Sequence, residues 1–324
     1  MPADEGARLI LTVRFQQWKL QFERIQRRQT LSAVHDFRVA TRRLRAGIGI
    51  FSPYFIKHTA APFDHFKKFA RLCGLARDLD VTIEHIAAYL PKISIREQKG
   101  VRYFLEQYRL KRQHEGLKIT EAFSSSDIIL IENTFFDVIK SPIMIVPELP
   151  DLRAFSRQVI DAKLLAVYEF DAVCRRPLEM DALHKMRIAV KHLRYILEMF
   201  DNCYEKKLRP FIDTCKHLQD QLGSIHDADV MIDALRSAIK KSSKSHLSAW
   251  LPLIRTVETV EETKRMVGSY RQFRQQDVIA GLVKLASIRM NERVHTYHDF
   301  VKFWSRYSIG FKEELQHIIK DKTP

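Results

Sequence analysis

The chain has 324 residues, of which 46% are hydrophobic and 29% charged, a composition typical of globular proteins and unlike that of disordered chains. Its 54 Lys and Arg residues outnumber its 39 Asp and Glu residues, and the resulting net charge of +15 creates a field that attracts polyanions. No apolar run approaches the roughly 18 residues of a membrane span, and neither a signal peptide nor a close cysteine pair is discernible, so we expect a cytoplasmic protein with free thiols.

Apolar residues recur at helical spacing along almost the whole chain, and Gly and Pro are few, so we predict an all-α fold. In the first segment Leu9, Val13, Trp18, Phe22 and Ile25 are expected to form the buried face. The predicted helices span residues 5–29, 33–56, 61–90, 95–122, 127–140, 151–175, 181–202, 206–240 and 245–274, with one or two more between 276 and 321. Turns are expected at 124–126 and 241–245.

Three prolines within residues 141–150 deny a helix its amide donors and favour extended backbone. We predict a linker there, which separates a first helical repeat of residues 1–140 from a second of residues 151–324. Each part is long enough to bury a core.

The segment from Val34 to Arg45 returns 149 residues later, from Leu183 to Arg194, which indicates an internal duplication. Extending this register from Ala33 to Val81 gives 14 identities in 49 positions, against roughly three expected from composition. The basic positions are retained in the pairs His35/His184, Arg38/Arg187, Arg42/Lys191, Arg45/Arg194 and Lys67/Lys216. Just before the two motifs, Ser32 and Asp181 are predicted N-caps.

The basic residues of each motif share one helix face. His35, Arg38, Arg42 and Arg45 fall within an arc of about 80°, and the apolar residues of the same helix lie on a separate, adjacent arc. His184, Arg187, Lys191 and Arg194 repeat this arrangement in the second copy. Like charges three and four residues apart destabilise an empty helix, so we interpret the two stripes as an anion-binding site.

A second repeated element follows each stripe. On its helix Lys67, Arg71, Gly74 and Asp78 share one face, and we expect Lys67, Arg71 and the equivalent Lys216 to be further anion ligands. The remaining expectations are that Asp78 and Asp227 orient neighbouring cations, that Asp80 and Asp229 form local structural pairs or caps, and that Gly74 and Gly223 let another helix pack closely. Weaker candidates, which would extend the groove, are Lys111, Arg112, Lys264 and Arg265.

These two motifs, each present twice in the same order, resemble the CHAD domain, the conserved histidine α-helical domain. Its pattern is a His-x-x-Arg-x-x-x-Arg/Lys-x-x-Arg helix followed by a Leu-Gly-x-x-Arg-Asp-x-Asp-Val segment. The matching stretches are His35 to Arg45 with Gly74 to Val81, and His184 to Arg194 with Leu222 to Val230. The chain departs from the pattern at Cys73, where the second copy has the usual Leu222, and at His226, which replaces the usual Arg.

The resemblance covers nearly the whole chain. It implies two helical bundles related by a pseudo-twofold axis, whose basic stripes face each other across a central groove that binds inorganic polyphosphate. It implies a non-catalytic protein without a cofactor and is compatible with association with polyphosphate granules. The Glu-x-Glu-x-Lys strand of the CYTH-type domain often fused to this family is not found, so the chain resembles a stand-alone member.

Polyphosphate offers no base or sugar to recognise, so its binding must rest on spaced cations such as forked Arg groups and mobile Lys groups. His35 and His184 each begin a stripe. We expect neighbouring cations to disfavour their protonation in the empty groove and phosphate to favour it, so that binding strengthens as the pH falls through the His range.

Other functions remain open. The His226-Asp227 dyad suggests an HD-type metal-dependent phosphohydrolase, but the first repeat has Arg77-Asp78 there, and a metal needs three or four convergent ligands. A nucleic-acid-binding helical protein would also use the positive charge, although Phe and Tyr fall mainly at apolar helical positions, which favours core packing over base stacking. A helical scaffold that grips acidic protein segments is a third alternative.

Overall fold

The structure, a computed structural model, describes residues 1–55, 60–141, 150–242, 258–269 and 277–321. The described residues form helices joined by short connections and contain no β-strand, which confirms the all-α prediction. The helices are α1 (Ala3–Arg27), α2 (Leu31–Phe51), α3 (Ala60–Tyr89), α4 (Ile95–Ser124), α5 (Ile128–Lys140), α6 (Leu152–Tyr168), α7 (Met180–Phe200), α8 (Arg209–Ser242), α9 (Val260–Ser269) and α10 (Asp277–Lys320). Short 3-10 turns span Ser52–Tyr54, Leu90–Lys92, Val173–Arg175 and Asp201–Tyr204.

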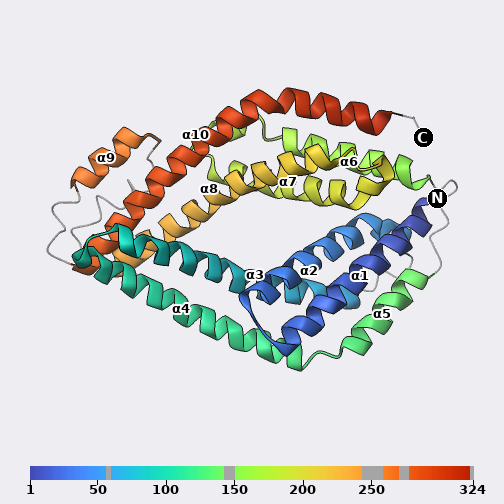
Figure 1. The fold of residues 1–324 in the computed structure, drawn as a ribbon, viewed down its shortest axis with the longest axis horizontal. Helices are drawn as coiled ribbons and strands as arrows, with labels where there is room; N and C mark the ends of the chain where they lie inside the picture. The colour runs from blue at the N-terminus through green and yellow to red at the C-terminus, as the bar shows by residue number, and fades with distance from the viewer. Residues whose placement is uncertain (56–59, 142–149, 243–257, 270–276, 322–324) are drawn as a thin grey trace.

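The helices before and after the predicted linker lie one group above the other, α1 to α5 below and α6 to α10 above (Figure 1). The long helices α4 and α10 form the lower and upper edges and converge at the left end, where they pack against each other (Figure 1). At the right end the chain start joins the second half, since the Ala3 amide donates to the Pro150 carbonyl at 3.1 Å and the Leu152 amide to the Met1 carbonyl at 3.0 Å. The two halves therefore meet at both ends of the molecule.

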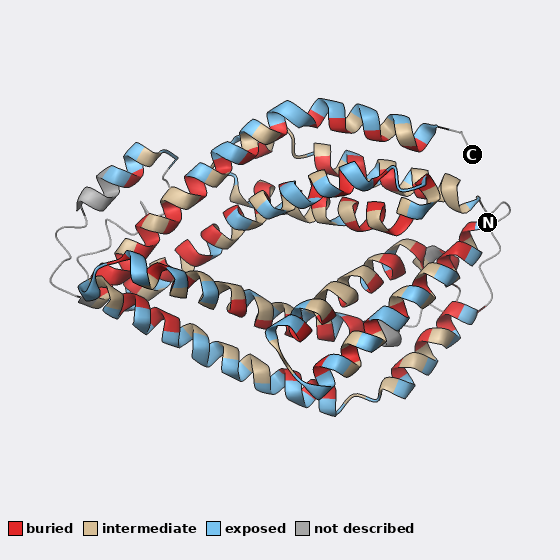
Figure 2. Ribbon diagram, viewed as in Figure 1, coloured by how far each residue is buried: buried red, intermediate tan, exposed pale blue. Residues whose placement is uncertain are grey.

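Buried residues run as stripes along the helices (Figure 2) and join into two hydrophobic clusters. The larger cluster contains Trp18 and Phe37 of the first half together with Leu193 and Trp304 of the second. The smaller one lies where the α3–α4 and α8–α10 pairs meet, and it includes Phe104 and Leu235. Both clusters draw on both halves, so the halves bury their apolar surface together.

The buried face of α1 differs from the predicted one. Trp18, Phe22 and Ile25 are buried as expected, but Leu9 and Val13 are exposed, and the stripe continues instead through Phe15 and Leu11. The residues from Leu11 to Ile25 follow each other at steps of three and four, whereas the step from Val13 to Trp18 is five. A five-residue step turns a side chain away from the shared face, which explains the error.

The predicted N-caps were wrong. Helix α2 begins at Leu31, and the Thr30 hydroxyl, not Ser32, accepts the Ala33 amide at 3.1 Å. Helix α7 has no side-chain cap, and Asp181 lies in its first turn, where it pairs with Lys185 at 2.6 Å. A carboxylate in the first turn still complements the helix dipole, so Asp181 acts at the expected end of the helix by a different interaction.

Several predicted boundaries also changed. The helix predicted over 151–175 ends at Tyr168 and is followed by a 3-10 turn. Between residues 276 and 321, where we predicted one or two helices, the described residues form one, α10, from Asp277 to Lys320. Of the helix predicted over 245–274, the described part forms α9. The remainder of that helix, the turn after residue 242 and linker residues 142–149 lie outside the described residues.

Two buried ion pairs tie the long helices of each half together. Asp80 of α3 accepts from the Arg112 guanidinium of α4 at 2.7 Å, and Asp229 of α8 accepts from Arg293 of α10 at 2.5 Å. Asp80 and Asp229 occupy equivalent positions in the repeat, and both form structural ion pairs, but these join two helices instead of being the local pairs or caps that we predicted. Removing one partner of such a buried pair leaves an uncompensated charge, so each pair holds its helices in register.

The close helix contact occurs at glycines that the repeat does not mark. A Cβ atom at Gly100 of α4 would lie 2.0 Å from the Val278 carbonyl oxygen, and one at Gly281 of α10 would lie 2.0 Å from the Glu97 carbonyl oxygen. Backbone atoms cannot rotate away as a flexible side chain can. The α4–α10 crossing therefore requires glycine on both helices.

We expect Gly100→Ala to lower the free energy of unfolding by about 2 kcal/mol or more, because the added methyl group forces α4 and α10 apart. Urea unfolding at fixed pH measures this change. Gly223→Ala is the matched control: a Cβ there meets nothing within 4 Å, so helix propensity should make this variant more stable by about 0.5–1 kcal/mol. Equal stabilities for the two variants would contradict the role assigned to the crossing.

Candidate anion-binding site

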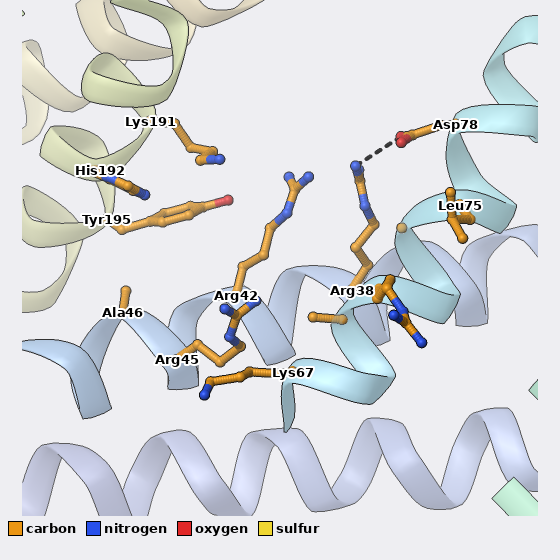
Figure 3. A pocket seen from close by; sticks show the side chains of 13 residues that line it. Arg38, Arg42, Arg45, Ala46, Lys67, Leu75, Asp78, Lys191, His192 and Tyr195 are labelled. Atoms are coloured by element: carbon orange, nitrogen blue, oxygen red, sulfur yellow. Dashed lines mark hydrogen bonds and ion pairs between the residues drawn. The ribbon is translucent and has the colours of Figure 1, made fainter. Parts of the chain in front are cut away.

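The first basic stripe lies on α2 beside that helix's buried edge. Phe37 and Leu44 are fully buried on the apolar edge, and the Trp18 indole donates to the buried Thr41 hydroxyl at 3.0 Å. This packing fixes the rotation of α2 about its axis. As a consequence Arg42 points toward Lys191 and Tyr195 of the second half, while Arg38 points to Asp78 on α3 (Figure 3).

A pocket of about 670 Å³ opens where α2 and α3 face α7 (Figure 3). Arg38, Arg42 and Lys191 reach into this space, the two arginines from α2 and the lysine from α7 (Figure 3). The complete lining is Arg38, Arg42, Arg45, Ala46, Lys67, Ala70, Arg71, Gly74, Leu75, Asp78, Lys191, His192 and Tyr195. It contains six Lys and Arg side chains and a single carboxylate, so its character is strongly cationic.

That carboxylate, Asp78, orients one of the cations. It accepts from the Arg38 guanidinium at 2.9 Å, and it is itself 68% exposed. Arg38 also lines the pocket, and its side chain is 19% exposed. Arg38 thus has a fixed direction without being fully neutralised.

Lys191 shows the electrostatic strain of the pocket most clearly. Burial, followed by the charges of Arg42, Arg187, Arg38 and Arg45, lowers the pKa of its ammonium group from 10.5 to about 8. Such a shift corresponds to roughly 3 kcal/mol of unfavourable interaction in the charged form. Burial and the neighbouring arginines therefore disfavour the charged form of Lys191 in the pocket lining.

The two arginines of the second stripe, Arg187 and Arg194, have different surroundings. Arg187 lies close enough to Arg38 and Arg42 for their charges to interact, and its buried Nε has no hydrogen-bond partner. Arg194 is placed differently, because Glu198 holds its guanidinium at 3.5 Å and also accepts from Arg43 at 2.9 Å. Neither Arg187 nor Arg194 is part of the pocket lining.

The histidines that begin the stripes lie at the edge of this cluster. Partial burial, then Arg77, lowers the pKa of His35, and partial burial, then Arg187 and Lys191, lowers that of His184. The His184 Nδ1 lies 3.1 Å from the Nδ1 of His226, a hydrogen-bond distance at which one nitrogen donates and the other accepts. Burial and Arg187 lower the pKa of His226 to about 4, which keeps this ring neutral near pH 7.

Of the two copies of the second repeated element, only the copy on α3 contributes residues to the pocket lining. Lys67, Arg71 and Gly74 of α3 line the pocket, whereas Lys216 and Gly223 of α8 do not. Lys67 and Lys216 each pair with an aspartate three residues earlier, at 2.9 and 2.7 Å. Asp227 is half-buried, and burial raises the pKa of its carboxyl, while the positive charge of Arg187 has the largest opposing effect.

The close-packing role predicted for Gly74 and Gly223 is wrong. A Cβ at Gly74 would meet only the Arg38 Nε, at 3.9 Å, and one at Gly223 would meet nothing within 4 Å. No helix approaches either residue closely enough to require glycine. At Gly74 the missing side chain instead leaves room in the pocket.

The weaker candidates lie outside the lining of this pocket. The Lys111 ammonium sits 4.9 Å from the Tyr108 ring centroid, Arg112 is bound to buried Asp80, and Lys264 pairs with Glu261 at 3.2 Å. Arg265 belongs to α9, but its side chain lies outside the described part of the structure.

Sequence analysis missed His192 and Tyr195, which both line the pocket from α7. The repeat places Arg43 and Ala46 at the equivalent positions, so a search for retained residues passes over them. The available signal was helical spacing, because Tyr195 follows Lys191 by four residues and therefore shares its face. Partial burial, with Lys191 and Lys163, lowers the pKa of His192 to about 4.

Two findings bear on the alternative functions. Among the described residues no group of three or more His, Cys, Asp and Glu side chains could hold a metal ion, and the His226-Asp227 dyad has no such third ligand there. No helix in the described parts of the chain is both long and apolar enough to span a bilayer.

Lys191→Met is expected to raise the free energy of unfolding of the ligand-free protein at pH 7, by up to about 3 kcal/mol, because it removes a largely buried cation that also lies near four arginines. The gain should shrink as the pH rises from 8 toward 10.5. In that range folded Lys191 has lost its proton while the unfolded chain keeps it, so the remaining penalty is the cost of removing that proton, which falls with rising pH and vanishes near pH 10.5. Urea unfolding at pH 7 and pH 9 checks this, and a gain that is absent or independent of pH would contradict it.

A family model for the CHAD domain matches residues 9–236. Among solved structures, PptA from Streptomyces chartreusis is similar with a TM-score of 0.65 and 14% identity, over 94% of this chain and 100% of that one. The crystal structure of the CHAD domain from the plant Ricinus communis is similar with a TM-score of 0.59 and 18% identity, over 87% of this chain and 92% of that one. No curated protein matches. Because the family model spans more than half of the sequence, the chain belongs to the CHAD domain family.

Proposed function

We propose that this protein binds inorganic polyphosphate without catalysis, in the pocket between α2, α3 and α7. The observation that carries the proposal is the lining, where six Lys and Arg side chains surround one exposed carboxylate. A polyanion without bases would be held by such forked and mobile cations alone. Membership of the CHAD domain family, which is associated with polyphosphate, supports the same ligand.

The electrostatics favour a ligand with several negative charges. Lys191 keeps a lowered pKa because of burial and four arginines, and a single small anion would offset few of them. Successive phosphate groups place one charge after another along a chain. A polyphosphate segment can therefore contact Arg38, Arg42 and Lys191 at once.

Nucleic acid is the weaker candidate for the same charge. Binding of single strands uses aromatic faces on which bases stack. The only aromatic side chains of the pocket lining are Tyr195, which is 4% exposed, and His192. The pocket thus offers phosphate ligands but little surface for a base.

Hydrolysis of the bound chain would need a group that activates water. The described residues bring together no metal-ligand set, and the one carboxylate of the pocket lining, Asp78, is engaged by Arg38. We therefore assign no reaction to the site. The four cysteines are free, which fits the reducing cytoplasm, where polyphosphate granules would supply the ligand.

The Arg38→Glu/Arg187→Glu variant should lose binding of long-chain polyphosphate, and wild-type affinity should fall steeply with rising salt concentration. Titrations over a salt series measure both effects. Lys240→Glu/Lys302→Glu is the matched control, since it changes the net charge equally at exposed positions outside the pocket. If both variants lost the same amount of affinity, the effect would be due to overall charge alone. If the Arg38→Glu/Arg187→Glu variant bound as well as the wild type, the proposed site would be wrong.

Competition by DNA and RNA at fixed salt concentration tests nucleic acid as the alternative ligand.

Polyphosphate binding near pH 8 should take up a proton, because a bound anion raises the pKa of Lys191 from about 8. Calorimetry in buffers of different ionisation enthalpy measures this uptake. The Lys191→Arg variant should bind polyphosphate without this proton uptake, since a guanidinium stays protonated.

A second proton uptake is expected below pH 7, where anion binding raises the lowered pKa values of His35 and His184. The His35→Gln/His184→Gln variant should lack this second uptake. Uptake unchanged in these variants would contradict the assignments.

A further inference from the structure

Although the motif is duplicated, most of the pocket lining comes from the first half of the chain. Helices α2 and α3 supply all of its lining except Lys191, His192 and Tyr195. At two positions of the repeat the residues of both copies line the pocket, namely Arg42 with its equivalent Lys191 and Ala46 with its equivalent Tyr195. None of the α8 residues equivalent to the α3 lining contributes to the pocket.

The corresponding faces of α3 and α8 differ in charge. On α3 the face carries Asp64, Lys67 and Arg71. At the equivalent positions α8 carries Asp213, Lys216 and then Asp220, an exposed acid in place of an arginine. Since Lys216 is already paired with Asp213, Asp220 leaves this face of α8 with a net negative charge.

Helix α7 likewise carries an acidic residue that its equivalent α2 lacks. Glu198 stands where α2 has Gly49, and it holds Arg194, the equivalent of Arg45. Arg45 is exposed and lines the pocket, so only the first copy keeps this arginine available. Tyr195, in place of Ala46, adds an aromatic ring on the second side.

We infer that the polyanion lies against α2 and α3 of the first half, and that Asp220 on α8 excludes it from the corresponding surface of the second half. From the second half, Lys191 contacts the ligand and Arg187 supports it from nearby. Arg71 is thus a binding residue and Asp220 a residue that limits the path by repulsion. This inference rests on the proposed function, because it concerns the placement of the same ligand.

The test exchanges the two charges. The Arg71→Asp/Asp220→Arg variant has the net charge of the wild type, so overall attraction is unchanged. A one-sided site predicts that its affinity for tripolyphosphate falls at least about tenfold, because Arg71 is lost from the ligand and replaced by an acid. Wild-type affinity in this variant would overturn the inference.

Single variants separate the two helices. Lys67→Ala should weaken tripolyphosphate binding about fivefold or more, while the equivalent Lys216→Ala should change it less than about twofold. Asp220→Arg should leave tripolyphosphate binding nearly unchanged and should strengthen binding of long-chain polyphosphate, which can then extend onto α8. Equal losses for Lys67→Ala and Lys216→Ala, or no gain for the long chain, would show that α8 is not excluded by Asp220.

The combination of binding results shows whether the one-sided placement or the proposed function itself is wrong. If the wild type binds polyphosphate, the Arg38→Glu/Arg187→Glu variant does not, and the exchange variant binds like the wild type, the function stands and the one-sided placement falls. If the wild type binds no polyphosphate, the function itself fails. Arg71 and Asp220 are both exposed, and circular dichroism spectra of the variants verify that their helices are intact.

Discussion

The structure depends on apolar packing that forces like charges together. Each motif helix carries a buried edge directly beside a cationic edge, so burying Phe37 on α2 and Leu193 on α7 turns Arg42 and Lys191 toward each other. The cost of this arrangement is visible in the pKa of Lys191, which burial first, and then the surrounding arginines, lower to about 8. Hydrophobic burial of several large side chains outweighs this combined cost of desolvation and repulsion, so the fold tolerates the clustered cations.

The remaining contacts keep this arrangement from relaxing. Helices α2 and α7 would move apart if the far end of the molecule opened, but α4 and α10 cross there with glycine against backbone. The buried pairs Asp80–Arg112 and Asp229–Arg293 fix the long helices that lead to this crossing. The pocket is therefore preorganised by parts of the molecule that do not line it, which spares the ligand the cost of ordering its cations.

Periodicity and the repeat predicted the helices and the two basic stripes, because both depend on local spacing along one helix. The N-caps, the roles of Gly74 and Gly223 and the placement of Arg194 depend on which neighbour is present, and spacing does not contain that information. Gly223 retains its identity without any close neighbour in the structure, so identity between the copies was no guide to packing there. Tyr195 was missed for the opposite reason, since it lines the pocket but differs between the copies.

The differences between the copies follow from the same electrostatic constraint. A symmetric site would add the equivalents of Arg45 and Arg71 to a pocket whose cations already repel, and each added charge would raise the free energy of the empty state. Glu198 neutralises the first of these charges, and Asp220 replaces the second with an acid. Restricting the cationic lining mainly to α2 and α3 keeps enough positive charge for a polyanion while limiting the repulsion in the folded protein. In this protein the second copy gives up part of that charge, at Arg194 through its pairing with Glu198 and at Asp220 through the change of residue.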